Sequence, residues 1–171
     1  MLAGTAFRPS ENDYDWLGRG IYFWEANPRR GIEFYKEART RKGLSTDDAM
    51  VVGAIIDLGH CLDLCTSTGV EAIKEAYGLV KSAFDQIEMP MPENTVGPDL
   101  LVRKLDCLVI NALHESRADN QLPPFDSVRG IFQEGDALYP TSGFRERTHV
   151  QIAVCEPAQI KGVFRVPDSH L

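Results

Sequence analysis

The chain has 171 residues, the length of one ordinary globular domain, which excludes a multidomain enzyme. Hydrophobic residues make up 43% and charged residues 25%, which excludes wholesale disorder, collagen-like repeats and a coiled coil. The net charge of −7 argues against a general electrostatic grip on nucleic acid. No apolar run approaches the roughly 20 residues of a membrane helix, and Met1–Gly4 lack the build of a signal peptide, so no membrane association and a cytoplasmic location are expected.

The first predicted elements are a turn, a strand and a helix. Aromatic and β-branched residues over 16–25 favour a strand, and Gly18 and Gly20 permit a tight turn or a close approach to a ligand. The pair Asn27-Pro28 is typical of a helix start, with an N-cap followed by proline. The helix is expected to end near Gly43.

Positive charges gather on this helix although the chain as a whole is acidic. A solvated helix face is the favoured interpretation, and a binding strip is the alternative. The cluster consists of Arg29, Arg30, Lys36, Arg39, Arg41 and Lys42.

The middle of the chain predicts a strand and two long helices. The apolar run 50–57 has no polar alternation, which predicts a central strand buried on both faces. A capping box at Thr68–Glu71 begins a helix whose apolar residues recur every three or four positions as far as Ile87. A second helix is expected to begin at an N-cap, Asp99, and to end at 114–116.

The last part of the chain is rich in strands. Short apolar runs predict strands over 128–132, 148–155 and 160–166, and the polar stretch 133–147 predicts a long loop. Strand and helix come first, two helices lie in the middle and strands close the chain. This order favours an α+β fold over a doubly wound sheet.

The cysteines are expected to be reduced thiols in apolar surroundings. Cys61 and Cys65 have the spacing of half a metal site, but no second pair and no histidine pair completes it, so no metal is expected. The four cysteines are Cys61, Cys65, Cys107 and Cys155.

Two segments resemble signature elements of the ADP-ribosyltransferase superfamily, in the branch with a His-Tyr-Glu triad that diphtheria-type toxins and poly-ADP-ribose polymerases share. Residues 18–23, Gly-Arg-Gly-Ile-Tyr-Phe, resemble its G-x-G-[IF]-Y-[FL] strand, and residues 148–160 resemble its last signature strand. The resemblance implies one ADP-ribosyltransferase-like domain over residues 1–171, with split antiparallel β-sheets and two long helices mid-chain. It also implies NAD as the substrate.

By this resemblance, Tyr22 would lie on the floor of the NAD cleft and stack on the nicotinamide ring. The alternative is a half-buried strand tyrosine without a ligand. The turn that would pass close to the cofactor consists of Gly18, Arg19 and Gly20. Three other aromatic residues are interpreted as core: Phe23, Trp24 and Tyr35.

Gln151 aligns with the catalytic glutamate of the family, which accepts a hydrogen bond from a ribose hydroxyl and stabilises positive charge as the nicotinamide bond breaks. A glutamine keeps the acceptor oxygen but brings no negative charge. Glu146 and Glu134 are the acids that could compensate, and Glu156 matches a structural position of the family. The alternative for Gln151 is a solvent-facing strand residue.

The third family element, a histidine in an H-G-[ST] strand, has no counterpart in this sequence. Either the protein has about 15 to 30 more residues upstream, which is within normal domain size, or it lacks a piece of its NAD site. Among the histidines present, only His149 could reach the cleft, by the side of Gln151, and an ordinary surface position is the favoured alternative for it.

The loop 133–147 occupies the place where family members carry the loop that selects the acceptor. Arg129, Arg145 and Arg147 flank it and could steer the cofactor pyrophosphate or an anionic acceptor, or could simply be solvated charges. The resemblance therefore predicts a bacterial mono-ADP-ribosyltransferase-like protein, a toxin or defence effector with a macromolecular acceptor and an antitoxin partner. Two alternatives remain: an inactive relative that binds a nucleotide or a partner, and an interaction domain without a nucleotide site.

Overall fold

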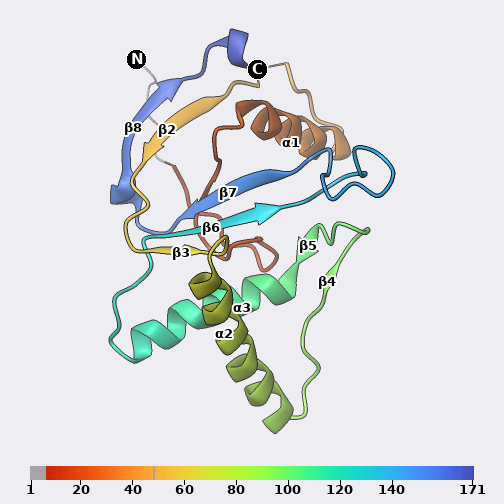
Figure 1. The fold of residues 1–171 in the computed structure, drawn as a ribbon. Helices are drawn as coiled ribbons and strands as arrows, with labels where there is room; N and C mark the ends of the chain where they lie inside the picture. Colours follow the sequence, from red (N-terminus) through yellow and green to blue (C-terminus); the bar gives the residue numbers. More distant parts are fainter. Residues whose placement is uncertain (1–6, 48) are drawn as a thin grey trace.

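A computed structural model describes residues 7–47 and 49–171, so the expectation for Met1–Gly4 lies outside the described residues. The chain is mixed α/β, with 34% helix and 23% strand in three helices and several small sheets. Figure 1 shows α1 above β7 and shows α2 and α3 below β6 and β3. The expected α+β composition is therefore confirmed.

The largest sheet has four strands in the order β1-β7-β6-β3. Their bounds are Ile21–Trp24 for β1, Cys61–Asp63 for β3, Ser127–Phe132 for β6 and His149–Val154 for β7. The pairs β1–β7 and β7–β6 are antiparallel, but β3 and β6 are parallel. The sheet is therefore mixed rather than wholly antiparallel, because α2 and α3 form the long crossover that a parallel pair requires.

The first two helices lie where the sequence predicts them, but the cap of the second differs. α1 spans Pro28–Arg41, and the Asn27 side chain accepts from the Arg30 N–H as expected. α2 spans Ser67–Gln86 and is capped by Thr66, whose extended backbone lets Oγ1 accept from the Gly69 N–H; Thr68 is already helical.

The third helix, α3, spans Lys104–Asp119, so it is shifted toward the C-terminus relative to the prediction. Asp99 does not cap it, because its carboxylate accepts from the Gly135 N–H on the loop after β6. Two short strands, β4 (Asn94–Thr95) and β5 (Val102–Arg103), fill the stretch before it. Two 3₁₀ turns lie near the C-terminus: η1 (Pro157–Gln159) and η2 (Asp168–His170).

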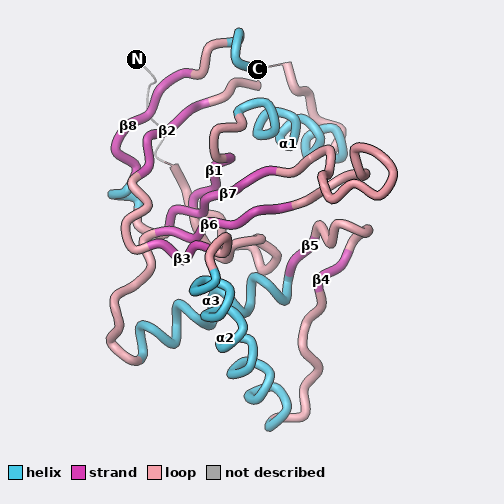
Figure 2. The backbone as a smooth tube through the Cα atoms, in the orientation of Figure 1, coloured by secondary structure: helices cyan, strands magenta, loops and turns pink. Residues whose placement is uncertain are grey.

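The apolar run at 50–57 is not a central strand. Its strand, β2 (Val52–Ile56), pairs only with β8 (Ile160–Arg165) in a two-stranded sheet, which Figure 2 shows as two adjacent magenta segments. With one partner strand, β2 leaves Ile55 62% exposed. β6 and β7 each have two partner strands, and β7 is the more deeply buried of the two.

The main core lies where the four-stranded sheet meets α3. It is built around Leu17, Leu62, Ile110, Val128 and Ala153, and a smaller cluster contains Ile21, Ile152 and Val154. Tyr35 is 45% exposed, so its expected place in the core is wrong. All four cysteines are free thiols.

The described part of the chain includes neither a helix that could span a membrane nor a cluster of metal-ligating side chains. None of its helices combines the length and the apolar character needed to cross a bilayer. No group of three or more metal-ligating side chains occurs there.

Candidate functional site

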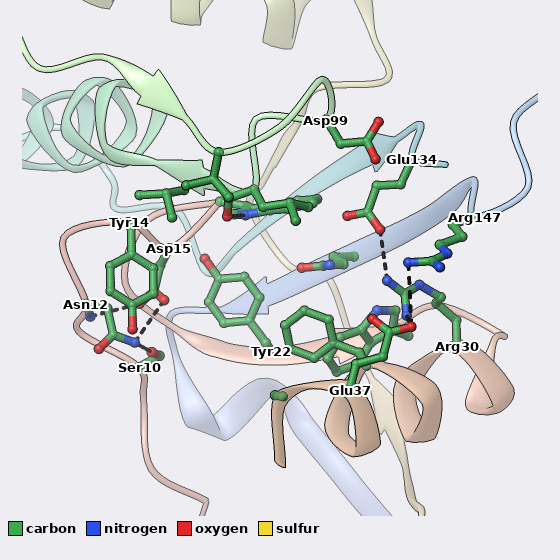
Figure 3. A pocket seen from close by; sticks show the side chains of 18 of the residues that line it. Ser10, Asn12, Tyr14, Asp15, Tyr22, Arg30, Glu37, Asp99, Glu134 and Arg147 are labelled. Atoms are coloured by element: carbon green, nitrogen blue, oxygen red, sulfur yellow. Dashed lines mark hydrogen bonds and ion pairs between the residues drawn. The ribbon is translucent and has the colours of Figure 1, made fainter. Parts of the chain in front are cut away.

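A cavity of about 630 Å³ lies between α1 and the segment 96–102, at one face of the four-stranded sheet. Its walls come from α1, from the segments 10–16 and 96–102, and from β1 and β7. The volume falls within the range of about 300–1,000 Å³ that is usual for small-molecule and cofactor sites. Figure 3 shows the side chains that point into it.

The strand pairing between β1 and β7 places three polar-tipped side chains on the cavity floor. Tyr22 and Trp24 share one face of β1 because side chains alternate along a strand. Trp24 lies directly opposite Gln151 of β7, so all three line the cavity. Trp24 is therefore a wall of the cavity rather than a core residue, and its buried Nε1 has no hydrogen-bond partner among the described residues.

The Tyr22 hydroxyl is fully engaged by the backbone of the preceding turn. It donates to the Gly18 carbonyl over 2.6 Å and accepts from the Leu17 N–H over 2.8 Å. Burial raises the pKa of Tyr22 well above its usual value, so the hydroxyl stays protonated. What Tyr22 offers a ligand is therefore its ring, held in a fixed position, and not an acid or a base.

Gln151 is 6% exposed and is oriented by His149. The Arg147 carbonyl can only accept, so His149 Nδ1 donates to it over 2.7 Å and carries the ring proton. His149 Nε2 is then an acceptor, and the group that lies 2.9 Å from it is the Gln151 amide nitrogen. The Gln151 Oε1 has no donor among the described residues, and the Gln151 side chain lines the cavity.

His149 itself does not line the cavity, although it lies on the same strand face as Gln151. It is 4% exposed, so it is not an ordinary surface residue either. Burial lowers its pKa, which keeps the ring neutral at neutral pH. His149 therefore reaches the cavity only indirectly, through its hydrogen bond to Gln151.

A buried ion pair closes one end of the cavity. The Arg30 Nη2 donates to Glu134 Oε2 over 2.8 Å, and the two residues are 5% and 2% exposed. Figure 3 shows the pair reaching across from α1 to the loop after β6. The Arg30 Nε and Nη1 have no hydrogen-bond partner among the described residues, and Glu37 lies 3.7 Å from Nη1.

Arg30 therefore departs from the solvated helix face expected for the basic cluster. The first turn of α1 packs against the loop after β6, and this packing buries Arg30. A buried guanidinium needs an acidic partner, which is Glu134 here. Other members of the cluster do lie at the cavity: Arg41 and Lys42 line it from the end of α1. Sequence spacing alone could not separate these positions, since the acid that selects Arg30 lies 104 residues away.

The turn 18–20 packs against the protein interior instead of the cavity. A Cβ on Gly18, whose φ is +72°, would come within 2.6 Å of the Asn111 side chain on α3. A Cβ on Gly20 would lie 3.1 Å from that of Ala153 on β7. Arg19 is exposed and its N–H donates to Asn111. Of the turn and the strand that follows it, the cavity receives Tyr22 and Trp24 only.

The remaining charged candidates lie outside the cavity lining, apart from Arg147. Glu146 is exposed on the loop 133–147 and does not line the cavity, so Glu134 is the one of the two predicted acids that reaches the site. Arg129 is held by Glu25 over 2.6 Å and by Asp63 over 3.3 Å, and does not line the cavity. Arg147 lines it and lies 3.6 Å from Glu37.

Two further predicted residues have local structural contacts. Arg145 donates to the Gly135 carbonyl and so braces the loop. The Glu156 side chain caps η1 by accepting from the Ala158 N–H.

Comparisons with known proteins returned nothing: no family model matches the chain, and no curated protein or solved structure matches it. The site is therefore interpreted from its own geometry. It combines one fixed aromatic ring, a glutamine acceptor and a buried arginine–glutamate pair in a cavity of cofactor size.

Proposed function

We propose that this domain binds NAD in the cavity and transfers its ADP-ribose group to a macromolecular acceptor. The observation that carries the proposal is convergence: Tyr22, Gln151 and the Arg30–Glu134 pair come from separate segments and line one cavity. The resemblance of residues 18–23 and 148–160 to ADP-ribosyltransferases predicts two of these positions. Arg30 joins these positions because it lines the same cavity.

The nicotinamide end of NAD would lie against Tyr22. The ring is held still because its hydroxyl makes two backbone hydrogen bonds, and a flat, fixed aromatic surface suits stacking on a flat heterocycle. Trp24 extends the same wall. Its unpartnered Nε1 donor could hydrogen-bond a polar group of the ligand after a small rearrangement.

The ribose would lie between two acceptors. Gln151 Oε1 suits a ribose hydroxyl, which donates. Glu134 uses Oε2 for Arg30, and no described residue donates to its Oε1. The carboxylate would supply the negative charge that Gln151 lacks when the glycosidic bond breaks. Its pairing with Arg30 would reduce this electrostatic effect. The absence of a fully charged group at 151 predicts a rate about 100- to 1,000-fold below that of a glutamate enzyme.

The pyrophosphate of NAD would be held by cations at the same cavity. Arg41 and Lys42 line it, and none of the ion pairs found in the described residues involves them. Arginine and lysine are the residues that bind phosphate oxygens, through bidentate and point-charge contacts respectively. The second interpretation of the basic cluster, a binding strip, thus applies to the end of α1.

In the reaction, the bond between ribose C1′ and the nicotinamide nitrogen breaks and its electron pair leaves with neutral nicotinamide. An acceptor nucleophile then bonds to C1′ and loses its proton to water or to a nearby carboxylate. The loop 133–147, which begins at the cavity with Glu134, presents three large apolar side chains at its tip that could contact the acceptor: Leu138, Tyr139 and Phe144. Free thiols favour a reducing compartment, so the proposed place of action is the cytoplasm.

A second candidate function is nucleotide binding without transfer. The neutral amide at 151 and the engagement of Glu134 with Arg30 favour it, because both reduce the negative charge available to the developing cation. Transfer releases free nicotinamide, whereas binding alone releases none.

The test is to incubate the chain with NAD, to measure heat of binding and to follow nicotinamide release by chromatography. We expect binding and slow release. Tyr22→Leu removes the stacking ring and should weaken binding by about tenfold or more, as expected for losing about 1.4 kcal/mol or more of contact energy. Tyr35→Leu is the matched control, because Tyr35 is exposed on α1 and does not line the cavity.

The outcomes separate the candidates. Binding with release supports the transferase, and binding without release supports the second candidate. No binding, or equal effects of the Tyr22 and Tyr35 variants, contradicts both. Gln151→Glu restores the missing charge and should raise the release rate if the domain is a transferase.

A further inference from the structure

His149 is sealed into the protein behind Gln151. Its ring is stacked on Trp16 with centroids 6.2 Å apart and lies 5.7 Å from the Phe132 ring. Both ring nitrogens are committed, one to the Arg147 carbonyl and the other to the Gln151 amide. A buried imidazole with no free nitrogen cannot hydrogen-bond a ligand directly. It can, however, fix the orientation of the Gln151 amide, which lines the cavity.

We propose that His149 is a positioning residue: its unprotonated Nε2 keeps the Gln151 amide turned so that Oε1 faces the cavity, and the site therefore selects a ligand group that donates a hydrogen bond. The inference rests on the proposed function only for the identity of that group, a ribose hydroxyl of NAD. The amide orientation itself is a property of the free protein.

The same arrangement makes the site sensitive to protonation of His149. The imidazolium carries a hydrogen on Nε2 as well, so two donors would face each other across 2.9 Å. The amide then gains by rotating half a turn, so that Oε1 accepts from His149 and the NH₂ group faces the cavity. The cavity loses its acceptor, and a donating ligand binds less well.

Charged groups around His149 set the pH at which this happens. Burial lowers its pKa, while its hydrogen bond to the Arg147 carbonyl and the Glu134 carboxylate raise it. The guanidinium groups of Arg30 and Arg103 lower it. Burial is the largest of these effects, so the ring is neutral at neutral pH and the acceptor orientation is the resting one.

The direct test is nuclear magnetic resonance of the ¹⁵N-labelled chain without any ligand. At about pH 7.5 we expect the Nδ1–H tautomer of His149 and a ¹⁵N–¹⁵N scalar coupling between the Gln151 amide and His149 Nε2 across their hydrogen bond. Protonation of His149 should abolish the coupling. An Nε2–H tautomer or an absent coupling at the higher pH overturns the proposal, whatever the protein does with NAD.

The second measurement is calorimetric NAD binding at about pH 7.5 and at a lower pH at which the magnetic resonance spectrum shows His149 protonated. Losing one neutral hydrogen bond should weaken binding about three- to tenfold at the lower pH. His149→Gln has no titrating ring and should remove the pH dependence. His114→Gln, on α3 outside the cavity lining, should leave it in place.

An unchanged pH dependence in the His149 variant overturns the positioning function. Absence of NAD binding at both pH values contradicts the proposed function instead, and the ligand-free coupling then still decides the orientation of Gln151. The two proposals can therefore fail separately.

Discussion

The four-stranded sheet and the two-stranded β2–β8 sheet differ in what their strands bury. β2 has only apolar side chains and glycine, yet Ile55 is 62% exposed. β7 carries His149 and Gln151, and both are buried. The difference arises because β7 has a neighbour on each edge and packing on both faces, while β2 has one partner strand. Burial follows the neighbours of a strand, and a polar residue buried on such a strand needs a partner or a function.

Breaking the buried ion pair should have the largest effect on the four-stranded region. Glu134→Gln leaves the Arg30 charge enclosed, with Glu37 at 3.7 Å as the remaining acid. The free energy of unfolding should fall by about 3–5 kcal/mol, as it does when one partner of a buried pair is removed. Urea unfolding measures it.

Glu33→Gln is the control, since Glu33 forms an exposed pair with Arg29 on the same helix. Its cost should be about 0–1 kcal/mol. Similar costs for the two variants would contradict the enclosure of Arg30.

Truncating one isoleucine in each sheet compares their packing directly. Ile152 of β7 is 7% exposed, so Ile152→Ala should cost about 2–4 kcal/mol through lost burial and the cavity left behind. Ile55→Ala on β2 should cost about 0.5 kcal/mol or less, because water already reaches that side chain. A large loss of stability in Ile55→Ala would mean that another surface covers β2 in solution.

Alanine replacements of two glycines should change the free energy of unfolding by smaller amounts and in opposite directions. Gly18→Ala should cost about 1–3 kcal/mol, because φ is +72° and the new methyl would meet Asn111 at 2.6 Å. Gly162→Ala on β8 has room, with the nearest atom 3.8 Å away, and should be neutral or stabilising by up to about 1 kcal/mol. If Gly18→Ala weakens NAD binding by more than its loss of folding stability explains, the turn 18–20 contacts the ligand.

The sequence predicted most elements but not their neighbours. Periodicity located α1, α2 and α3 and the strands β6, β7 and β8, because local patterns of apolar residues determine these. It located β2 but wrongly made it a central strand, since an apolar run does not state how many strands will flank it. It also misplaced two caps: Thr66 and not Thr68 has the extended backbone, and Asp99 binds a loop amide instead of a helix end.

The candidate site divides in the same way. The sequence predicts Tyr22 and Gln151 because their strands carry recognisable motifs, and Glu134 because it is an acid on the loop before the last signature strand. Arg30 and Trp24 were missed because their position depends on contacts with distant segments. His149 was placed on the correct strand face, but only the three-dimensional structure shows that Trp16 and Phe132 cover it.

The smallest expected effect is the pH dependence of stability contributed by His149. Because burial lowers its pKa in the folded protein, the unfolded chain binds the proton more readily. Its contribution to stability is therefore complete above the unfolded value of about 6.5 and is lost as the pH falls toward the folded value, with a slope of at most about 1.4 kcal/mol per pH unit. The strands β2 and β8 contain no histidine and contribute nothing in this range. Urea unfolding of wild type and His149→Gln across this range isolates the effect, because the other histidines cancel in the difference. A difference that stays constant with pH would mean that His149 is hydrated, and it would remove the basis for a fixed Gln151 amide.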